Sequence, residues 1–369
     1  MSAITPHQAR QLDSVRGLSS LIVLVGHANQ TFITPIESEH SVFVGFFTQF
    51  AVMVFFALSG FLVGTSIFRN IERNQHFLIG KYAYDRALRI YPPLIAATFL
   101  MVLIWKISPH IFPSGTYLFA ETSNQLARTG ITTNTKEIFG SLLFLNGFKT
   151  TTPGPNGPLW SLSYEVWYYI FAGLLFMLPR RKLLAIILLL TAIYLTRKNQ
   201  QFIMFSTVWA AGLVLAKYHH SGRLPSAKRM QMAATSLTVA TILTMVCVLK
   251  LNPGHSAWLT PWNYFMVVSG IWFTVILAMV MQGAISLPTC FHKSATYSYT
   301  LYIVHFPIML LVLGTFQTTI LDSIENAVLV ATTTVLFCVI IAAIMAKYVE
   351  NKKLLETHFK TLSLQMTDK

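Results

Sequence analysis

Long apolar runs, separated by short polar segments, are the feature that most restricts what this chain can fold into. A run of about 20 apolar residues is long enough for an α-helix to cross the hydrocarbon core of a bilayer. The sequence contains ten candidate spans, which lie near residues 16–35, 43–68, 90–107, 158–178, 183–196, 202–218, 231–250, 262–281, 295–316 and 325–347. The run at 183–196 is short enough to be a tilted span or half of a hairpin with its successor. The sequence therefore predicts an all-α polytopic membrane bundle of about ten transmembrane helices.

The composition excludes most classes of soluble protein. Of the 369 residues, 54% are hydrophobic and 11% are charged, whereas about 25% are charged in an ordinary soluble protein. The net charge of +14 would suit a nucleic-acid partner if the basic residues covered a soluble face. They form short clusters between apolar runs instead, as in a polytopic membrane protein. We therefore expect contact with membrane lipids and no nucleic-acid partner.

The positions of the basic residues predict the orientation of the chain. If the N-terminus is cytoplasmic and the spans alternate, 20 of the 27 Lys and Arg residues lie in cytoplasmic segments and 7 lie outside. The positive-inside rule favours this arrangement, which makes both termini cytoplasmic. We expect one membrane domain over 1–350, with an extracytoplasmic loop at 108–157, and a short cytoplasmic tail over 351–369. Within the loop, residues 137–148 predict a helix that lies in the interface or re-enters the membrane.

Ionisable residues inside membrane spans are costly, so each is a candidate for function. Asp13 and Arg16 lie at the cytoplasmic entrance of the first span, and His27 follows eleven residues after Arg16. That spacing is about 16 Å along a helix, which puts His27 near mid-membrane. Histidine is well suited to take and return a proton near neutral pH. A hydrogen bond to a neighbouring helix would explain His27 without catalysis, and spacing alone does not decide between the two.

A pair of arginines marks the entrance of the third span. Arg86 and Arg89 are three residues apart, so they project from one face of a helix. Two guanidinium groups on one face suit a phosphate or pyrophosphate. Anchoring to anionic lipid head groups is the alternative, and on these residues alone it is the preferred one. The following Pro92-Pro93 predicts a bend near the start of a helix.

Two later spans also carry ionisable residues. Glu165 lies about a third of the way into an apolar run, where a carboxyl group either carries a proton or forms half of an ion pair. We favour the functional role over a structural ion pair with an arginine. The aromatic residues around it, Trp160 and Tyr164 among them, could stack on sugar rings, although packing in the membrane belt explains them more simply. His305 precedes Phe-Pro, and we expect it to bond a backbone carbonyl that the proline frees.

The sequence lacks the motifs of the common metal, nucleotide and serine-nucleophile sites. The loop histidines lack HExxH or Cys/His spacing, and the sequence contains no P-loop, GxGxxG or GxSxG motif. The three cysteines are far apart, which argues against a disulfide framework or a zinc site. We expect no metal and no permanently bound cofactor.

Five segments, taken in order, resemble the acyltransferase-3 family of integral membrane acyltransferases, which includes O-acetyltransferases of bacterial surface polysaccharides. The segments are residues 12–18 followed by His27, the FFALSGFL run at 55–62, the RALRIYP run at 86–92, PLWSLSYE at 158–165 and YTLYIVHFP at 299–307. Ser14 stands where a glycine is common in the family. The resemblance extends from about residue 10 to 350.

The resemblance implies transfer of an acyl group, usually acetyl, from cytoplasmic acyl-CoA to a hydroxyl of an extracytoplasmic or lipid-linked glycan such as O-antigen, capsule or exopolysaccharide. It implies a location in the bacterial inner membrane. Arg16, Arg86 and Arg89 would then bind the CoA phosphates, His27 would be the base, and Glu165 would orient His27 or contact the sugar. Secondary candidates for acceptor contacts are Asp13, Trp160, Ser161, Tyr164 and His305.

Two other functions remain open on the residues alone. A proton-coupled transporter also uses intramembrane His and Glu, although it often shows inverted repeats with broken helices, which we do not find in this sequence. A structural component of a polysaccharide assembly system would tolerate replacement of His27. The sequence does not specify the glycan, its hydroxyl, the acyl group or the oligomeric state.

Overall fold

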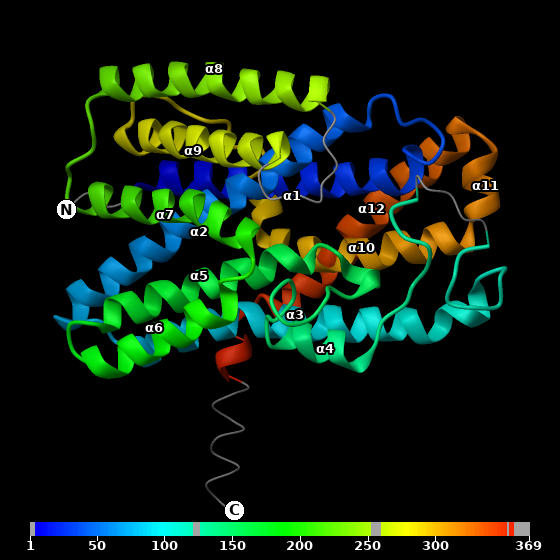
Figure 1. Ribbon diagram of the computed structural model, residues 1–369, viewed down its shortest axis with the longest axis horizontal. Helices are drawn as coiled ribbons and strands as arrows, with labels where there is room; N and C mark the ends of the chain where they lie inside the picture. The colour runs from blue at the N-terminus through cyan, green and yellow to red at the C-terminus, as the bar shows by residue number, and fades with distance from the viewer. Residues whose placement is uncertain (1–3, 121–125, 252–259, 353, 358–369) are drawn as a thin grey trace, which may run out of the picture.

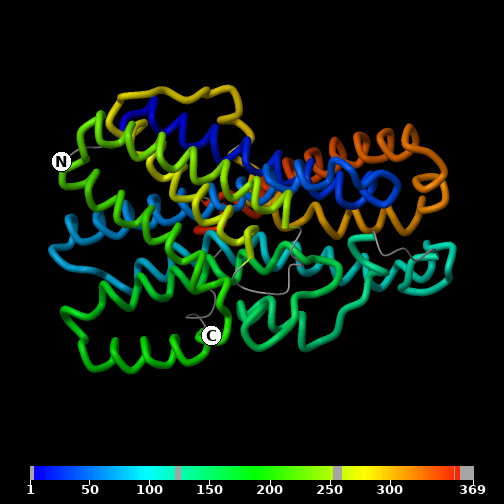
Figure 2. Tube along the Cα trace, turned by 45° about the horizontal axis from the view of Figure 1, so that its top comes forward, coloured from blue at the N-terminus to red at the C-terminus, as the bar shows by residue number. Residues whose placement is uncertain are grey.

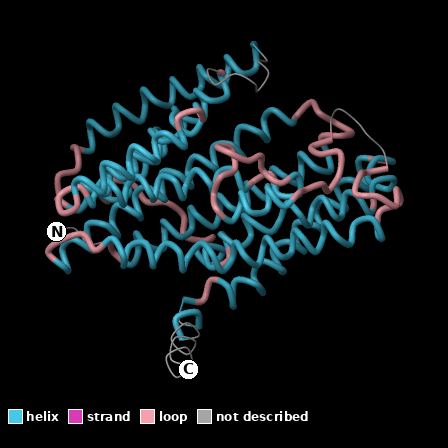
Figure 3. Tube along the Cα trace, turned by 60° about the horizontal axis from the view of Figure 1, so that its bottom comes forward, coloured by secondary structure: helices cyan, strands magenta, loops and turns pink. Residues whose placement is uncertain are grey.

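The chain folds into a helical bundle. The computed structural model describes residues 4–120, 126–251, 260–352 and 354–357, and within them the regular elements are helices, with no strand (Figure 3). The α-helices are α1 (Pro6–Ala28), α2 (Ser41–Asn74), α3 (Ile79–Ile111), α4 (Thr135–Leu142), α5 (Leu159–Met177), α6 (Lys182–Thr196), α7 (Gln200–His220), α8 (Ala227–Leu251), α9 (Pro261–Gln282), α10 (Ser298–Thr315), α11 (Gln317–Asp322) and α12 (Ile324–Val349). A π-helix, η1 (Asn29–Ile33), and two 3-10 helices, η2 (Gly154–Asn156) and η3 (His292–Thr296), complete them.

Among the described residues, seven helices are long and apolar enough to cross a membrane: α2, α3, α7, α8, α9, α10 and α12. The other predicted spans correspond to α1, α5 and α6. Helix α6 is apolar but has only 15 residues, while α1 and α5 carry the polar side chains of the site described below. The prediction of an all-α polytopic bundle is confirmed. The count of ten spans and the cytoplasmic termini stay predictions.

Two helices begin well before the spans predicted from their apolar runs. Helix α1 starts at Pro6, where Thr5 and Gln8 form a capping box and proline takes the first helical position. Helix α3 starts at Ile79, after Leu78, whose N–H donates to Asn70 Oδ1 at 2.9 Å. Pro92 and Pro93 therefore lie inside α3, and the prediction that they stand near a helix start is wrong. Arg86 and Arg89 consequently lie on continuous helix rather than at its entrance.

Small residues bring α2 and α7 into close contact. A Cβ atom on Gly60 would overlap the carbonyl oxygen of Trp209, and one on Gly212 would overlap that of Ala57. Glycine at both positions lets the backbones approach, as small residues do between membrane helices. Trp209 then donates from Nε1 to Ser59 Oγ at 3.2 Å. This contact fixes the face of α2 that lines the site.

Helices α8 and α6 form two edges of the bundle, and the packing partner of α6 differs from the predicted one. Helix α8 lies at one edge against α9, with most of its side chains exposed (Figure 1). Helix α6 forms an antiparallel hairpin with α5 at the opposite edge (Figure 2). The expected hairpin partner of this segment was its successor, α7, so that part of the prediction is wrong.

The predicted external segment 108–157 is ordered where the structure describes it. It contains α4, which ends at Leu142 and so covers only part of the predicted helix at 137–148. Trp167 Nε1 of α5 donates to the carbonyl of Phe144 at 2.9 Å. Asn156, at the end of the segment, donates from Nδ2 to the carbonyl of Ile303 in α10 at 2.8 Å. These bonds fasten the segment to the bundle next to the candidate site.

Candidate functional site

Two histidines from distant parts of the chain meet inside the bundle. His27 is on the last turn of α1 and His305 is in the middle of α10, and the two helices pack together. His27 Nδ1 lies 2.7 Å from His305 Nε2, and the rings are stacked with centroids 5.0 Å apart. His305 is buried, whereas His27 is only partly buried. The pair therefore has one closed side and one side that faces open space.

The hydrogen bonds assign the protons of this pair. His305 Nδ1 lies 2.8 Å from the carbonyl oxygen of Leu301, which can only accept, so Nδ1 of His305 carries a proton. In the neutral imidazole His305 Nε2 is then the acceptor, and His27 Nδ1 must donate to it. A neutral His27 is left with its lone pair on Nε2. This is the arrangement of a base whose tautomer is fixed by the group behind it.

The role expected for His305 has to be corrected. The carbonyl freed by Pro307 belongs to Ile303, four residues earlier. Asn156 Nδ2 satisfies that oxygen at 2.8 Å. His305 bonds the carbonyl of Leu301 and uses its other nitrogen for His27. The prediction that His305 bonds the carbonyl freed by the proline is therefore wrong. His305 instead contacts His27 Nδ1, on the side of the ring away from the vestibule.

His27 opens onto a large hollow, the histidine vestibule, with a volume of about 880 Å³. Among the described residues, its lining combines amide side chains with aromatic rings and a single charged residue, Lys198. Amide side chains that line it are Asn29, Gln30, Gln49, Asn199, Gln200, Gln201 and Asn263, and the aromatic residues are Trp160, Tyr164, Phe205 and Trp262. Two predicted site residues, Trp160 and Tyr164, therefore share this hollow with His27. Such a lining suits an uncharged, hydroxyl-rich ligand.

The arginines gather in a second hollow, the arginine cavity, with a volume of about 460 Å³. Arg16 from α1 and Arg86 and Arg89 from α3 line it together. The Nε atoms of Arg16 and Arg86 are buried and have no hydrogen-bond partner among the described residues. Arg89 is exposed to this space. Unsatisfied donors on converging guanidinium groups are what an anion such as a phosphate requires.

A narrow cavity of about 60 Å³ adjoins the arginine cavity. It shares Arg16 and Arg89 with the arginine cavity, and it is also lined by Glu165, Ser161 and Tyr302. Ser161 Oγ and Tyr302 Oη, which both line it, are 2.5 Å apart. Ser161 follows Trp160, which lines the histidine vestibule. The narrow cavity therefore adjoins the arginine cavity, and α5 carries neighbouring residues that line the narrow cavity and the vestibule.

Glu165 and Asp13 lie outside the lining of the histidine vestibule. Glu165 accepts a hydrogen bond from the hydroxyl of Tyr169 and lies near Arg89, but it lines the narrow cavity rather than the histidine vestibule. It does not orient His27, because His305 occupies that position. Asp13 pairs with Arg16 at 3.1 Å, and it is absent from the lining of the three spaces.

Two residues near the site were not anticipated. Glu350, at the end of α12, accepts from the N–H and hydroxyl of Thr300 at 2.9 and 2.6 Å and lines the arginine cavity beside Arg16 and Arg89. Arg128, in the predicted external segment, acts electrostatically on His27. Arg128 is one of the seven basic residues that the predicted orientation places outside, and Glu350 belongs to none of the motifs. No sequence signal links either one to a residue of the site.

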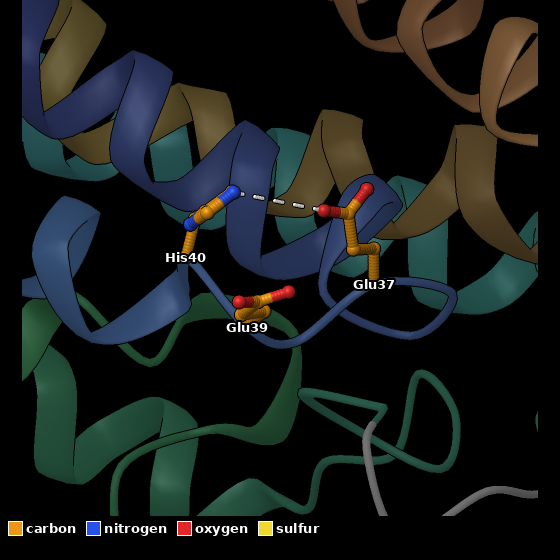
Figure 4. A group of neighbouring side chains, drawn as sticks. All are labelled: Glu37, Glu39 and His40. Carbon is orange, nitrogen blue, oxygen red and sulfur yellow. Dashed lines mark ion pairs between the residues drawn. The ribbon is translucent and has the colours of Figure 1, made fainter.

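A cluster of two carboxylates and a histidine lies in the loop between η1 and α2, whose flanking residues Thr34 and Ser41 line the histidine vestibule. Glu37, Glu39 and His40 could together present ligand atoms to a metal ion, and all three are exposed (Figure 4). His40 Nε2 is 3.9 Å from Glu37 Oε1. Exposed acidic groups of this kind are common without an ion, so we assign it no metal.

The comparisons with known proteins agree with this geometry. A model of an acyltransferase domain matches residues 10–345. The chain belongs to the acyltransferase-3 family. It is 25% identical over 330 residues to the peptidoglycan O-acetyltransferase OatA of Listeria monocytogenes serovar 1/2a (strain ATCC BAA-679 / EGD-e), a match that covers 81% of this chain and 49% of the relative. The chain thus spans about half the length of this curated relative, and no solved structure matches.

Proposed function

We propose that this acyltransferase moves an acetyl group from acetyl-CoA, bound in the arginine cavity on the cytoplasmic side, to a hydroxyl of an extracytoplasmic glycan in the histidine vestibule. The observation that carries the proposal is the 2.7 Å contact between His27 and His305, because it presents a lone-pair nitrogen to a polar hollow. The name of the relative OatA, a peptidoglycan O-acetyltransferase, supports an acetyl group and a surface glycan. The protein would act in the inner membrane of a bacterium.

The arginine cavity supplies the properties that a CoA donor requires. Arg16, Arg86 and Arg89 bring three positive charges together, and buried Nε donors of the first two lack partners among the described residues. Phosphates are bound bidentately by such groups. The extended pantetheine arm would pass through the narrow cavity, where the bond between Ser161 and Tyr302 has to open. Glu350 would limit the excess positive charge when the donor is absent.

The reaction itself needs a base at the end of this path. His27 Nε2 removes the proton from the acceptor hydroxyl as its oxygen attacks the thioester carbonyl carbon. The tetrahedral intermediate collapses, the carbon–sulfur bond breaks, and the protonated imidazole returns its proton to the leaving thiolate. His305 holds His27 in the required tautomer throughout. The products are an O-acetyl ester in the vestibule and CoA on the other side.

The acceptor side fits a sugar better than a charged polymer. The amide groups of the vestibule offer both donors and acceptors to hydroxyls, and Trp160 and Tyr164 offer faces for stacking. Of the described residues in this lining, Lys198 is the one that carries a charge. These features support a largely uncharged glycan as the acceptor.

The test is chemical analysis of envelope glycans from cells with the gene deleted and then restored. Base-labile acetate should fall on deletion and return with the wild-type gene. His27→Ala should not restore it at equal protein level, because general-base catalysis contributes about 10²–10⁴-fold. His110→Ala, which removes an exposed histidine near the end of α3, is the matched control and should restore it fully. Unchanged acetate on deletion would contradict the function, and more than a tenth of wild-type acetate with His27→Ala would contradict the base.

A further inference from the structure

Directly after α12, the chain turns back against the bundle. Glu350, at the end of α12, is bonded to Thr300 of α10. Asn351 then caps a short helical turn, because its Oδ1 accepts from the N–H of Leu354 at 3.2 Å. Lys352 lies at the start of this turn. The part of the predicted cytoplasmic tail that follows α12 is therefore held next to the arginine cavity.

The side chain of Lys352 reaches from this turn to α3. Its Nζ lies 3.0 Å from Asp85 Oδ1, on the residue that precedes Arg86. A second carboxylate, Glu356 of the same turn, lies 3.6 Å from Nζ. An ammonium group carries three donors, so two carboxylates leave one of them for another partner. The contacts thus hold Lys352 in place, while 59% of its side chain stays exposed to an incoming ligand.

Lys352 also lines the arginine cavity itself. Among the described residues, four cations line this cavity against two carboxylates, Asp85 and Glu350, so a positive excess remains. Arg16 and Arg89 line the narrow cavity as well. Lys352 is not part of the described lining of the narrow cavity. It therefore belongs to the portion of the arginine cavity that the two spaces do not share.

We propose that Lys352 binds the 3′-phosphate of the CoA donor, so that the enzyme selects acetyl-CoA over donors that lack this group. The proposal rests on the donor binding proposed above and adds a residue that determines specificity. In that binding mode the pantetheine arm leaves the arginine cavity past Arg16 and Arg89. The 3′-phosphate is on the ribose, at the opposite end of CoA from the thioester, and Lys352 lies on the side that receives this end.

The chemistry of the two groups matches. A phosphate monoester carries about −1.5 to −2 charges at neutral pH and offers three strong acceptor oxygens. Lysine binds such a group as a flexible point charge, whereas the arginine forks suit the pyrophosphate. An ion pair with Asp85 that only fastens the tail is the alternative. Such an exposed pair contributes little to stability, and it predicts no difference between donors with and without the 3′-phosphate.

The experiment measures equilibrium binding of acetyl-CoA and of acetyl-dephospho-CoA, which lacks the 3′-phosphate. It uses purified full-length protein in nanodiscs of zwitterionic lipid, so that no anionic head group competes for the cations. The wild type should bind acetyl-CoA about fivefold more tightly, because the dephospho form loses one partly exposed, charge-assisted hydrogen bond. Lys352→Ala should weaken binding of acetyl-CoA by the same factor and leave the dephospho form within twofold. Lys352→Arg should keep the preference, because it keeps the charge.

Lys347→Ala is the matched control, because it removes another exposed lysine, one in the last turn of α12 that is absent from the described lining of the cavity. It should bind both donors as the wild type does. Equal weakening of both donors by Lys352→Ala would show that Lys352 only fastens the tail. Equal affinity of the wild type for both donors would exclude a contact with the 3′-phosphate while leaving the donor site intact. If the wild type binds neither donor, the proposed donor site is itself wrong, and this inference fails with it.

Discussion

Replacing His305 by alanine tests the histidine pair most directly. The substitution removes the acceptor of His27 Nδ1–H, a contact of 2.7 Å. It also leaves a cavity inside the protein, because the His305 side chain is buried and only 1% exposed. Some loss of folding stability is therefore expected. Each unsatisfied buried polar group costs about 1–3 kcal/mol. Two effects are therefore expected, one on folding and one on catalysis, and the assay has to separate them.

The catalytic effect can be estimated from the proton assignment. Without His305 the His27 proton is free to sit on either nitrogen, and the ring loses the group that holds its orientation. A base whose tautomer is no longer fixed loses much of the about 10²–10⁴-fold that general-base catalysis contributes. We expect kcat to fall about 10²-fold, which corresponds to about 2.7 kcal/mol of transition-state stabilisation. His305→Gln should lose less, because its amide oxygen can still accept from Nδ1.

The assay is kcat per folded molecule in nanodiscs, with the folded fraction taken from size-exclusion chromatography. Asn156→Ala is the matched control, since it removes the bond to the Ile303 carbonyl on the same helix without touching either histidine. It should lower the amount of folded protein while kcat per folded molecule stays within twofold. A His305→Ala protein that keeps more than half of wild-type kcat would show that His305 only packs the core, and the proton assignment would be refuted.

The remaining predictions concern topology and the donor site. A cysteine at Thr133 should react with an impermeant thiol reagent in intact cells whereas one at Ser226 should not, and the reverse pattern would overturn the orientation. Arg86→Ala and Arg89→Ala should each weaken binding of acetyl-CoA about tenfold or more in titrations of purified protein, because a charge-assisted hydrogen bond contributes about 1.5–3 kcal/mol. Lysine at either position should rescue binding only in part, and unchanged binding in both alanine variants would make them membrane anchors.

Much of the fold could be predicted from the sequence because apolar length and helical spacing are local properties. The 3.6-residue period places Arg86 and Arg89 on one face, and they do line one cavity. The helix starts at Pro6 and Ile79 were missed, because polar residues continue both helices beyond their apolar runs. The apolar pattern of a membrane helix predicts which of its residues contact lipid better than it predicts where the helix begins or ends.

The site could be predicted only one residue at a time. His27 and His305 are 278 positions apart, and their contact depends on how α1 packs on α10. The same packing turns Glu165 toward Arg89 and away from His27. Arg128 gave no signal at all, because a cation in a polar segment is ordinary until the segment folds over the bundle. Contacts between residues so far apart in the chain depend on the tertiary structure, so local sequence patterns do not predict them.

The hydrogen bond between Ser161 and Tyr302 has a consequence for the energetics of the whole cell. A bacterial membrane stores work as an ion gradient, and one elementary charge crossing 100 mV releases about 2.3 kcal/mol. A continuous column of water from the arginine cavity to the histidine pair would let ions leak through each enzyme molecule and dissipate that gradient. The narrow cavity holds only about 60 Å³, and these two bonded hydroxyls line it, so it offers little room for such a column. If acetyl groups cross the bundle here as proposed, a passage that opens only around a pantetheine arm would keep the membrane electrically sealed during transfer.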